Sequence, residues 1–137
     1  MMRSRSWLLF LTLFAFYGCA IAQPKSTQKK IQQLLQQGYL RLEEGETTQA
    51  IGLFREVLLI DSNQVQAWVG FAQGEAQRKQ HAKSVSCFQR ARNLSPDALA
   101  SLLPLYAEEL AGIGEFQTAL SLIDSLLRRS EEHTSEL

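Results

Sequence analysis

The body of this 137-residue sequence repeats itself with a period of 34 residues. After a shift by that period, residues of the same size class meet at the following positions: Leu34 and Trp68, Gly38 and Ala72, Ala50 and Ser84, Phe54 and Phe88, Val57 and Ala91, Ile60 and Leu94. Self-similarity at a fixed period is typical of stacked architectures, in which each unit buries its apolar face against its neighbours. The repeat therefore predicts a stack of similar units.

Apolar spacing within the units predicts helices. Ile51, Phe54 and Leu58 follow one another at steps of three and four residues, as do Leu120, Ile123 and Leu127. Side chains at these steps share one face of a helix.

Residues typical of helix ends separate the predicted helices. Glycines in the runs 44–46 and 111–114 are suited to the left-handed conformation that closes a helix. Ser95 is a natural N-cap, and Pro96 suits the first helical position. Small residues at positions such as Gly38 let two helices approach closely.

These residues resemble the signature of the tetratricopeptide family. In the second unit they are Trp68, Ala72, Phe88, Ala91 and Pro96; in the first, Gly38, Gly45, Ala50 and Phe54; in the third, Leu103, Ala107, Gly114 and Ala119. The resemblance covers roughly residues 31–128. It implies an all-α fold, a right-handed superhelix of about three stacked helix-turn-helix pairs, with units at 31–64, 65–98 and 99–128.

The third unit departs from this pattern. Ala119 follows Ser84 by 35 residues, which indicates one inserted residue. Pro104 would kink a helix that began near Pro96; alternatively, that helix begins later, near Ser101.

The N-terminus resembles an export signal. Arg3 and Arg5 precede an apolar run from Trp7 to Tyr17 and then small residues, which predicts a secretory signal over 1–22 and a short leader over 23–30. A retained membrane anchor is an alternative, although the run is shorter than the roughly 20 apolar residues that a helical span needs. Cys19 offers a third interpretation, lipidation within a lipobox-like sequence. We expect a bacterial periplasmic protein or, alternatively, an outer-membrane lipoprotein.

The last nine residues, 129–137, resemble the translation of a common sequencing adapter. We therefore exclude them from the fold and expect the native protein to continue past Arg128 with at least one further helix.

The composition and the reactive residues argue against nucleic-acid binding and catalysis. Fourteen basic residues balance fourteen acidic ones, without the basic patch that binds phosphates. His81 is expected to be a solvated turn residue, and the pairs Glu43–Glu44 and Glu108–Glu109 to be solvated surface. Cys87 is expected to be buried and inert, or else available for an intermolecular bond. We predict no enzymatic activity, no cofactor and no metal site.

In the tetratricopeptide family, the first helix of each unit faces the concave side, where peptides or partner helices bind. The positions that this implies are Gln32, Leu35, Gln36, Tyr39, Leu42, Gln66, Val69, Gln73 and Gln77. They lack the lysine and asparagine clamp by which the family's chaperone adaptors hold a terminal carboxylate, so no such ligand is inferred. Trp68 and Phe88 are expected in the core.

The resemblance thus implies a protein-interaction scaffold of the cell envelope whose partner is a protein or peptide. The alternative is a recruiting arm of a longer protein with an enzymatic or export component. A membrane is a partner only if Cys19 is lipidated or the signal is retained.

Overall fold

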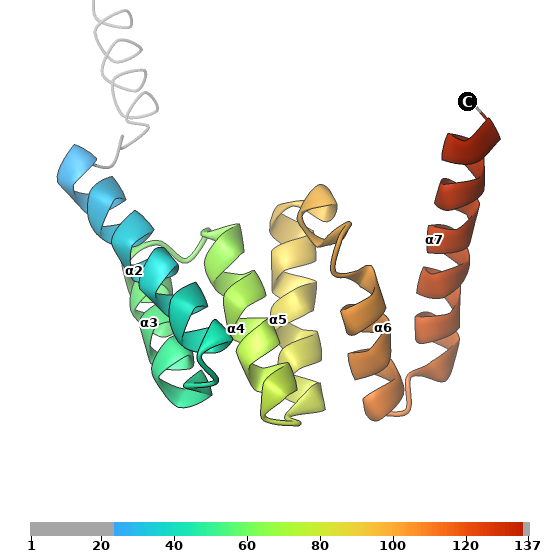
Figure 1. Ribbon diagram of the computed structural model, residues 1–137, viewed down its shortest axis with the longest axis horizontal. Coiled ribbons are helices and arrows are strands. Elements are labelled where there is room, and N and C mark those ends of the chain that lie inside the picture. Colours follow the sequence, from blue (N-terminus) through green and yellow to red (C-terminus); the bar gives the residue numbers. More distant parts are fainter. Residues whose placement is uncertain (1–23, 136–137) are drawn as a thin grey trace, which may run out of the picture.

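The computed structural model describes residues 24–135, and helices and turns account for all of them. The elements are α2 (Lys25–Glu43), α3 (Thr47–Ile60), α4 (Val65–Gln77), α5 (His81–Leu94), the 3-10 helix η1 (Pro96–Leu99), α6 (Leu103–Gly112) and α7 (Phe116–Ser135). Figure 1 shows the α-helices in a row in chain order, each antiparallel to the next. The predicted all-α class is confirmed.

The predicted export signal, residues 1–22 with Cys19, lies outside the described residues. The predicted leader is helical from Lys25 onward, because it forms the first turns of α2. Between residues 24 and 135, no helix is both long and apolar enough to span a membrane.

The same turn closes the first helix of each pair. Gly45, Lys79 and Gly114 have φ angles of 79°, 60° and 86°, and they are spaced by 34 and 35 residues. In each turn the next amide N–H donates to the carbonyl five residues earlier, at 2.8 Å, 2.9 Å and 2.9 Å. This arrangement is a Schellman motif, which satisfies the last carbonyls of a helix. The expectation for the two glycines is confirmed, and the inserted residue lies between the second and third turns.

The links between pairs also repeat. Asp61 and Ser95, 34 residues apart, are both extended, with φ and ψ of −147° and 103° and of −151° and 105°. The predicted N-cap at Ser95 is wrong, because its side chain makes no capping hydrogen bond to η1. Of the two alternatives for Pro104, the later helix start is correct: α6 begins at Leu103, so Pro104 lies in the first turn, where a missing N–H costs nothing.

The core is built on Phe54 and Phe88, which are both 0% exposed. Gly38 and Gly70 make room for Phe54, since a Cβ atom there would lie 2.7 Å and 2.3 Å from its ring. Because real Cβ contacts are longer than this, both glycines permit close helix packing, as expected at Gly38. Cys87 is buried, as predicted.

Trp68 is not a core residue, contrary to the prediction. It is only partly buried, and its indole N–H donates to the carbonyl of Ser62 at 2.8 Å. The ring stacks on Phe71 at 6.4 Å between centroids, and the guanidinium of Arg90 lies 5.9 Å from its centre. Trp68 therefore braces the link after α3.

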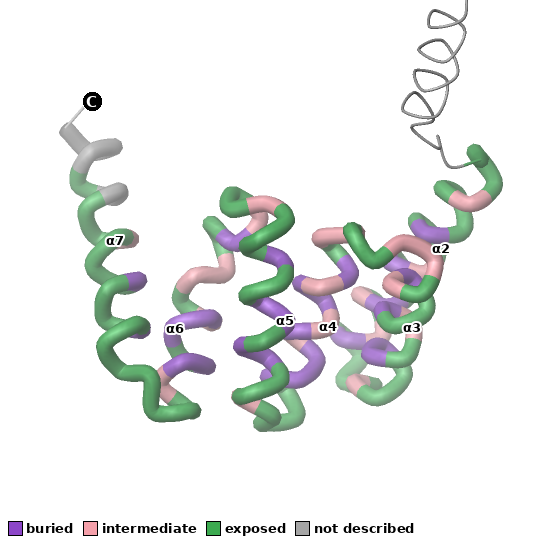
Figure 2. The backbone as a smooth tube through the Cα atoms, turned by 180° about the vertical axis from the view of Figure 1, so that it is seen from behind, coloured by how far each residue is buried: buried purple, intermediate pink, exposed green. Residues whose placement is uncertain are grey.

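Burial falls toward the C-terminal end of the row. In Figure 2, buried segments lie between α2 and α6, whereas the described part of α7 is exposed over most of its length. Only Ala119 and Leu122 are buried among the described side chains of α7. The helix thus packs on α6 with one narrow face.

Candidate partner-binding groove

The first helices of the three pairs, α2, α4 and α6, together line a groove made of two hollows. The larger set of residues surrounds a hollow of about 400 Å³: Tyr39, Leu42, Glu43, Gln73, Ala76, Gln77, Lys79, Leu105, Glu108 and Glu109. The other hollow, of about 420 Å³, is lined by Gln32, Leu35, Gln36, Tyr39 and Gln66. Tyr39 is common to both, so we call the first the acidic hollow, the second the glutamine hollow, and the two together the groove.

The structure brings together most of the residues that the sequence placed here. Every predicted groove residue except Val69 lines one of the hollows. Val69 instead lies in the apolar core, 9% exposed, because it points toward the second helix pair. Leu35 and Leu42 are also buried, at 6% and 7% exposure, so they form the floor of the groove rather than outward contacts.

Tyr39 is held in place between the two hollows. Its hydroxyl donates to the carbonyl of Gln66 on α4 at 2.8 Å. Its ring meets Phe54 edge to face, with 5.1 Å between centroids. Burial raises the pKa of Tyr39 to about 12, against a smaller lowering by a hydrogen bond from the backbone of Gly70. The side chain is therefore a neutral, fixed wall.

Gln77, on the rim of the acidic hollow, is oriented from the neighbouring helix. The hydroxyl of Thr47, the first residue of α3, donates to its Oε1 at 2.9 Å. Fixing an amide in this way lowers the entropy lost when it binds a ligand.

The sequence did not assign to the groove the residues that the third pair contributes. Leu105 and Glu108 reach it from α6, and Lys79 from the α4–α5 turn. The prediction of a solvated pair is correct for Glu108 but wrong for Glu109, which is 2% exposed. The repeat held a signal for this burial, because Glu75, which precedes Glu109 by one period, is also 2% exposed.

His81 has a partner, contrary to the expectation of a solvated turn residue without a role. Its Nδ1 lies 3.1 Å from Oε2 of Glu109, so the contact joins α5 to α6. Gly112 makes room for the ring, since a Cβ atom there would lie 2.7 Å from it. His81 thus positions a carboxylate of the acidic hollow.

Glu75 is a second buried acid. Its Oε1 lies 3.9 Å from a guanidinium nitrogen of Arg78, and its Oε2 has no hydrogen-bond partner among the described residues. Burial, followed by the charge of Glu75, raises the pKa of Cys87 to about 11. The thiol is therefore a poor nucleophile at neutral pH.

The described side chains contain no group of three or more His, Cys, Asp or Glu residues that could hold a metal ion. No protein-family model matches the chain.

Proposed function

We propose that this chain is a non-catalytic protein-interaction module of the tetratricopeptide type. In this proposal the pairs α2–α3, α4–α5 and α6–α7 are tetratricopeptide units that stack into a right-handed superhelix, and the groove holds a peptide or a partner helix. The protein acts as a scaffold of the bacterial cell envelope, exported to the periplasm or, if Cys19 is lipidated, held at the outer membrane.

One observation carries the proposal: a single continuous groove crosses the first helix of all three pairs. Tyr39 joins its two hollows, and α2, α4 and α6 each contribute side chains. A groove that runs across successive helices suits an extended segment, which can contact each unit in turn.

The chemistry of the groove also supports binding rather than catalysis. Its exposed polar side chains are mostly amides, such as Gln32, Gln36 and Gln66. Amides both donate and accept hydrogen bonds, so they can satisfy the backbone of a bound peptide.

The experiment is site-specific photo-crosslinking in an expressing bacterium. A benzophenone amino acid replaces Gln36 or Gln73 in the groove, or Gln89, an exposed residue of α5, as the control. We expect the two groove positions to crosslink to the same partner and Gln89 to yield no such adduct. Equal adducts from all three positions, or none from the groove, would contradict the proposal.

A further inference from the structure

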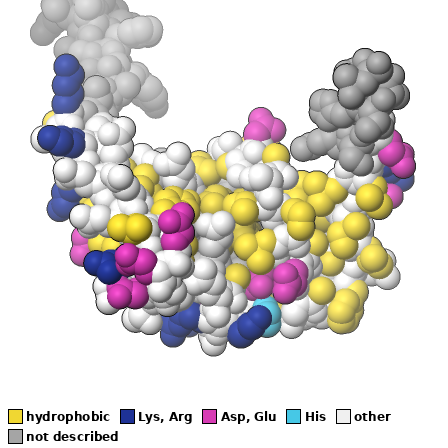
Figure 3. All heavy atoms as spheres, viewed as in Figure 1, with side chains coloured by type: hydrophobic (Ala, Val, Ile, Leu, Met, Phe, Trp, Pro, Cys, Tyr) yellow, Lys and Arg dark blue, Asp and Glu magenta, His cyan; other side chains and the backbone are white. Residues whose placement is uncertain are grey.

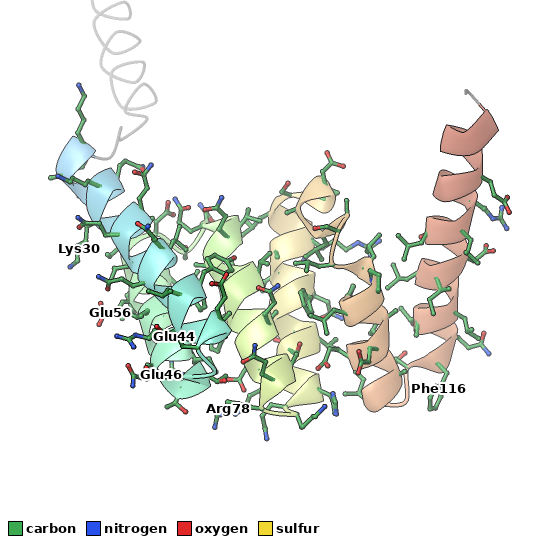
Figure 4. All side chains as sticks on the ribbon, in the orientation of Figure 1. Lys30, Glu44, Glu46, Glu56, Arg78 and Phe116 are labelled. Carbon is green, nitrogen blue, oxygen red and sulfur yellow. The ribbon has the colours of Figure 1, made fainter. Side chains whose placement is uncertain are left out.

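A second, apolar groove lies between α6 and α7. It encloses about 540 Å³ and is floored by small residues, among them Ala107 and Ala111. Its α7 wall carries large apolar side chains that are strongly exposed: Phe116 (62%), Leu120 (60%), Ile123 (43%) and Leu127 (58%). Figure 3 shows apolar side chains gathered over this part of the molecule, and Figure 4 places Phe116 at the first turn of α7.

These side chains form one face of the helix. Residues 116, 120, 123 and 127 follow at steps of four, three and four, which aligns them along α7. Contiguous exposed apolar surface of this kind marks interaction sites in soluble proteins.

Charge defines what the apolar groove can accept. Glu108 is the one charged residue among the described side chains that line it, and Glu108 also lines the acidic hollow. The two sites are therefore continuous. Beyond Glu108 the acidic hollow adds Glu43 and Glu109 against a single cation, Lys79.

We propose that the α6–α7 groove docks a partner segment of defined chemistry: apolar side chains that seat on α7, next to a Lys or Arg that faces Glu108 and Glu43. The inference rests on the proposed function, because it gives the partner of the same surface a composition. A basic side chain complements the net negative charge of the acidic hollow, and the adjoining apolar side chains remove the exposed face of α7 from water.

A second copy of the chain fits this groove less well. Two copies that docked through it would each bring Glu108 to the shared interface, and the described lining supplies no cation to neutralise them. Like charges placed together oppose association.

The test selects binders without bias and then locates them. A random dodecapeptide display library is selected on the chain from Gln23 onward, which retains every described helix and its contacts. Enriched peptides are synthesised with a fluorophore, and their affinities are measured by anisotropy for the wild type and for variants. We expect enriched peptides to pair two or more apolar residues with a Lys or Arg.

The variants separate the two parts of the site. Leu120→Gln should weaken binding about tenfold, because apolar anchors at the centre of an interface dominate its affinity. Glu108→Gln should weaken it about threefold and reduce its salt dependence, as expected for an exposed ion pair. Glu56→Gln makes the same change of charge on α3, at the other end of the row (Figure 4), and should have no effect.

Each other outcome has a distinct meaning. Peptides without basic residues, or peptides that lose affinity with Gln73→Ala but not with Leu120→Gln, would overturn this inference and leave the proposed function standing. A dimer in light scattering that Leu120→Gln dissociates would assign the α7 face to self-association and overturn the inference too. Binding that responds to none of the groove substitutions would contradict both proposals.

Discussion

Nδ1 of His81, the first residue of α5, lies 3.1 Å from Oε2 of Glu109 on α6. The imidazole side chain is 32% exposed, whereas the carboxylate side chain is 3% exposed. A buried carboxylate needs hydrogen-bond partners, so this contact stabilises the junction between the second and third helix pairs.

His81→Ala should therefore lower the free energy of unfolding by about 1–3 kcal/mol, the usual cost of leaving a buried acceptor unsatisfied. Urea unfolding measures this change. The double variant His81→Ala/Glu109→Leu should recover part of the loss, because the unpaired acid is gone. Lys83→Ala, an exposed change on the same helix, should leave the midpoint in place. Equal midpoints for His81→Ala and Lys83→Ala would show that the contact contributes nothing.

Phe88→Ala should be the most damaging of three comparable substitutions. Removing this fully buried ring should cost about 3–5 kcal/mol, since a cavity remains in the core. Trp68→Ala should cost less, because Trp68 is only partly buried, and Gln73→Ala in the groove should be nearly neutral. Circular-dichroism melts give the order, and a reversed order would mean that the described packing is wrong.

Lys79→Gly should stabilise the protein. Lys79 has a φ of 60°, where glycine avoids a clash of its Cβ atom, so the gain should be about 0.5–1 kcal/mol. Gly45→Ala, at the equivalent turn, should cost about 1 kcal/mol for the same reason. Gly52→Ala is the control with the opposite sign: this helical glycine is exposed with open space around it, so alanine should stabilise by about 1 kcal/mol. Destabilisation by Lys79→Gly would contradict the left-handed turn.

Tyr39 should make stability fall at high pH. Burial raises its pKa from 10.0 to about 12, so the folded state favours the neutral phenol. The resulting contribution, about 2–3 kcal/mol at most, is fully present below pH 10 and is lost as the pH rises through 12. Urea midpoints at pH 8 and pH 11.5 should therefore fall further for the wild type than for Tyr39→Phe. Equal losses in the two proteins would rule out a buried hydroxyl at this position.

The sequence predicts the helical elements well because one period fixes both the turns and the core. The turn glycines Gly45 and Gly114, and the buried aromatics Phe54 and Phe88, were all identified by their spacing. Lys79 escaped notice because lysine has no preference for the left-handed conformation; only its register with the glycines indicates it.

The groove was harder to predict because one helix face carries both inward and outward positions. Gln32 and Gln36 line it as expected, but Val69 turns into the core, where a difference of a fraction of a helical turn decides burial. Glu109 could not be separated from its neighbour Glu108 by residue type, and its partner His81 lies 28 residues away. Contacts between units depend on how the pairs stack, which the period does not specify.

Phe71 is the meeting point of two otherwise separate apolar cores. One core joins residues of α2, α3 and α4, the other joins residues of α4 to α7, and Phe71 packs against both. In a chain whose units touch only their neighbours, cooperativity passes from one half to the other through such a seam. A segment bound across α2, α4 and α6 would form a second bridge over that seam, so that the two halves of the protein lose structure together rather than one after the other.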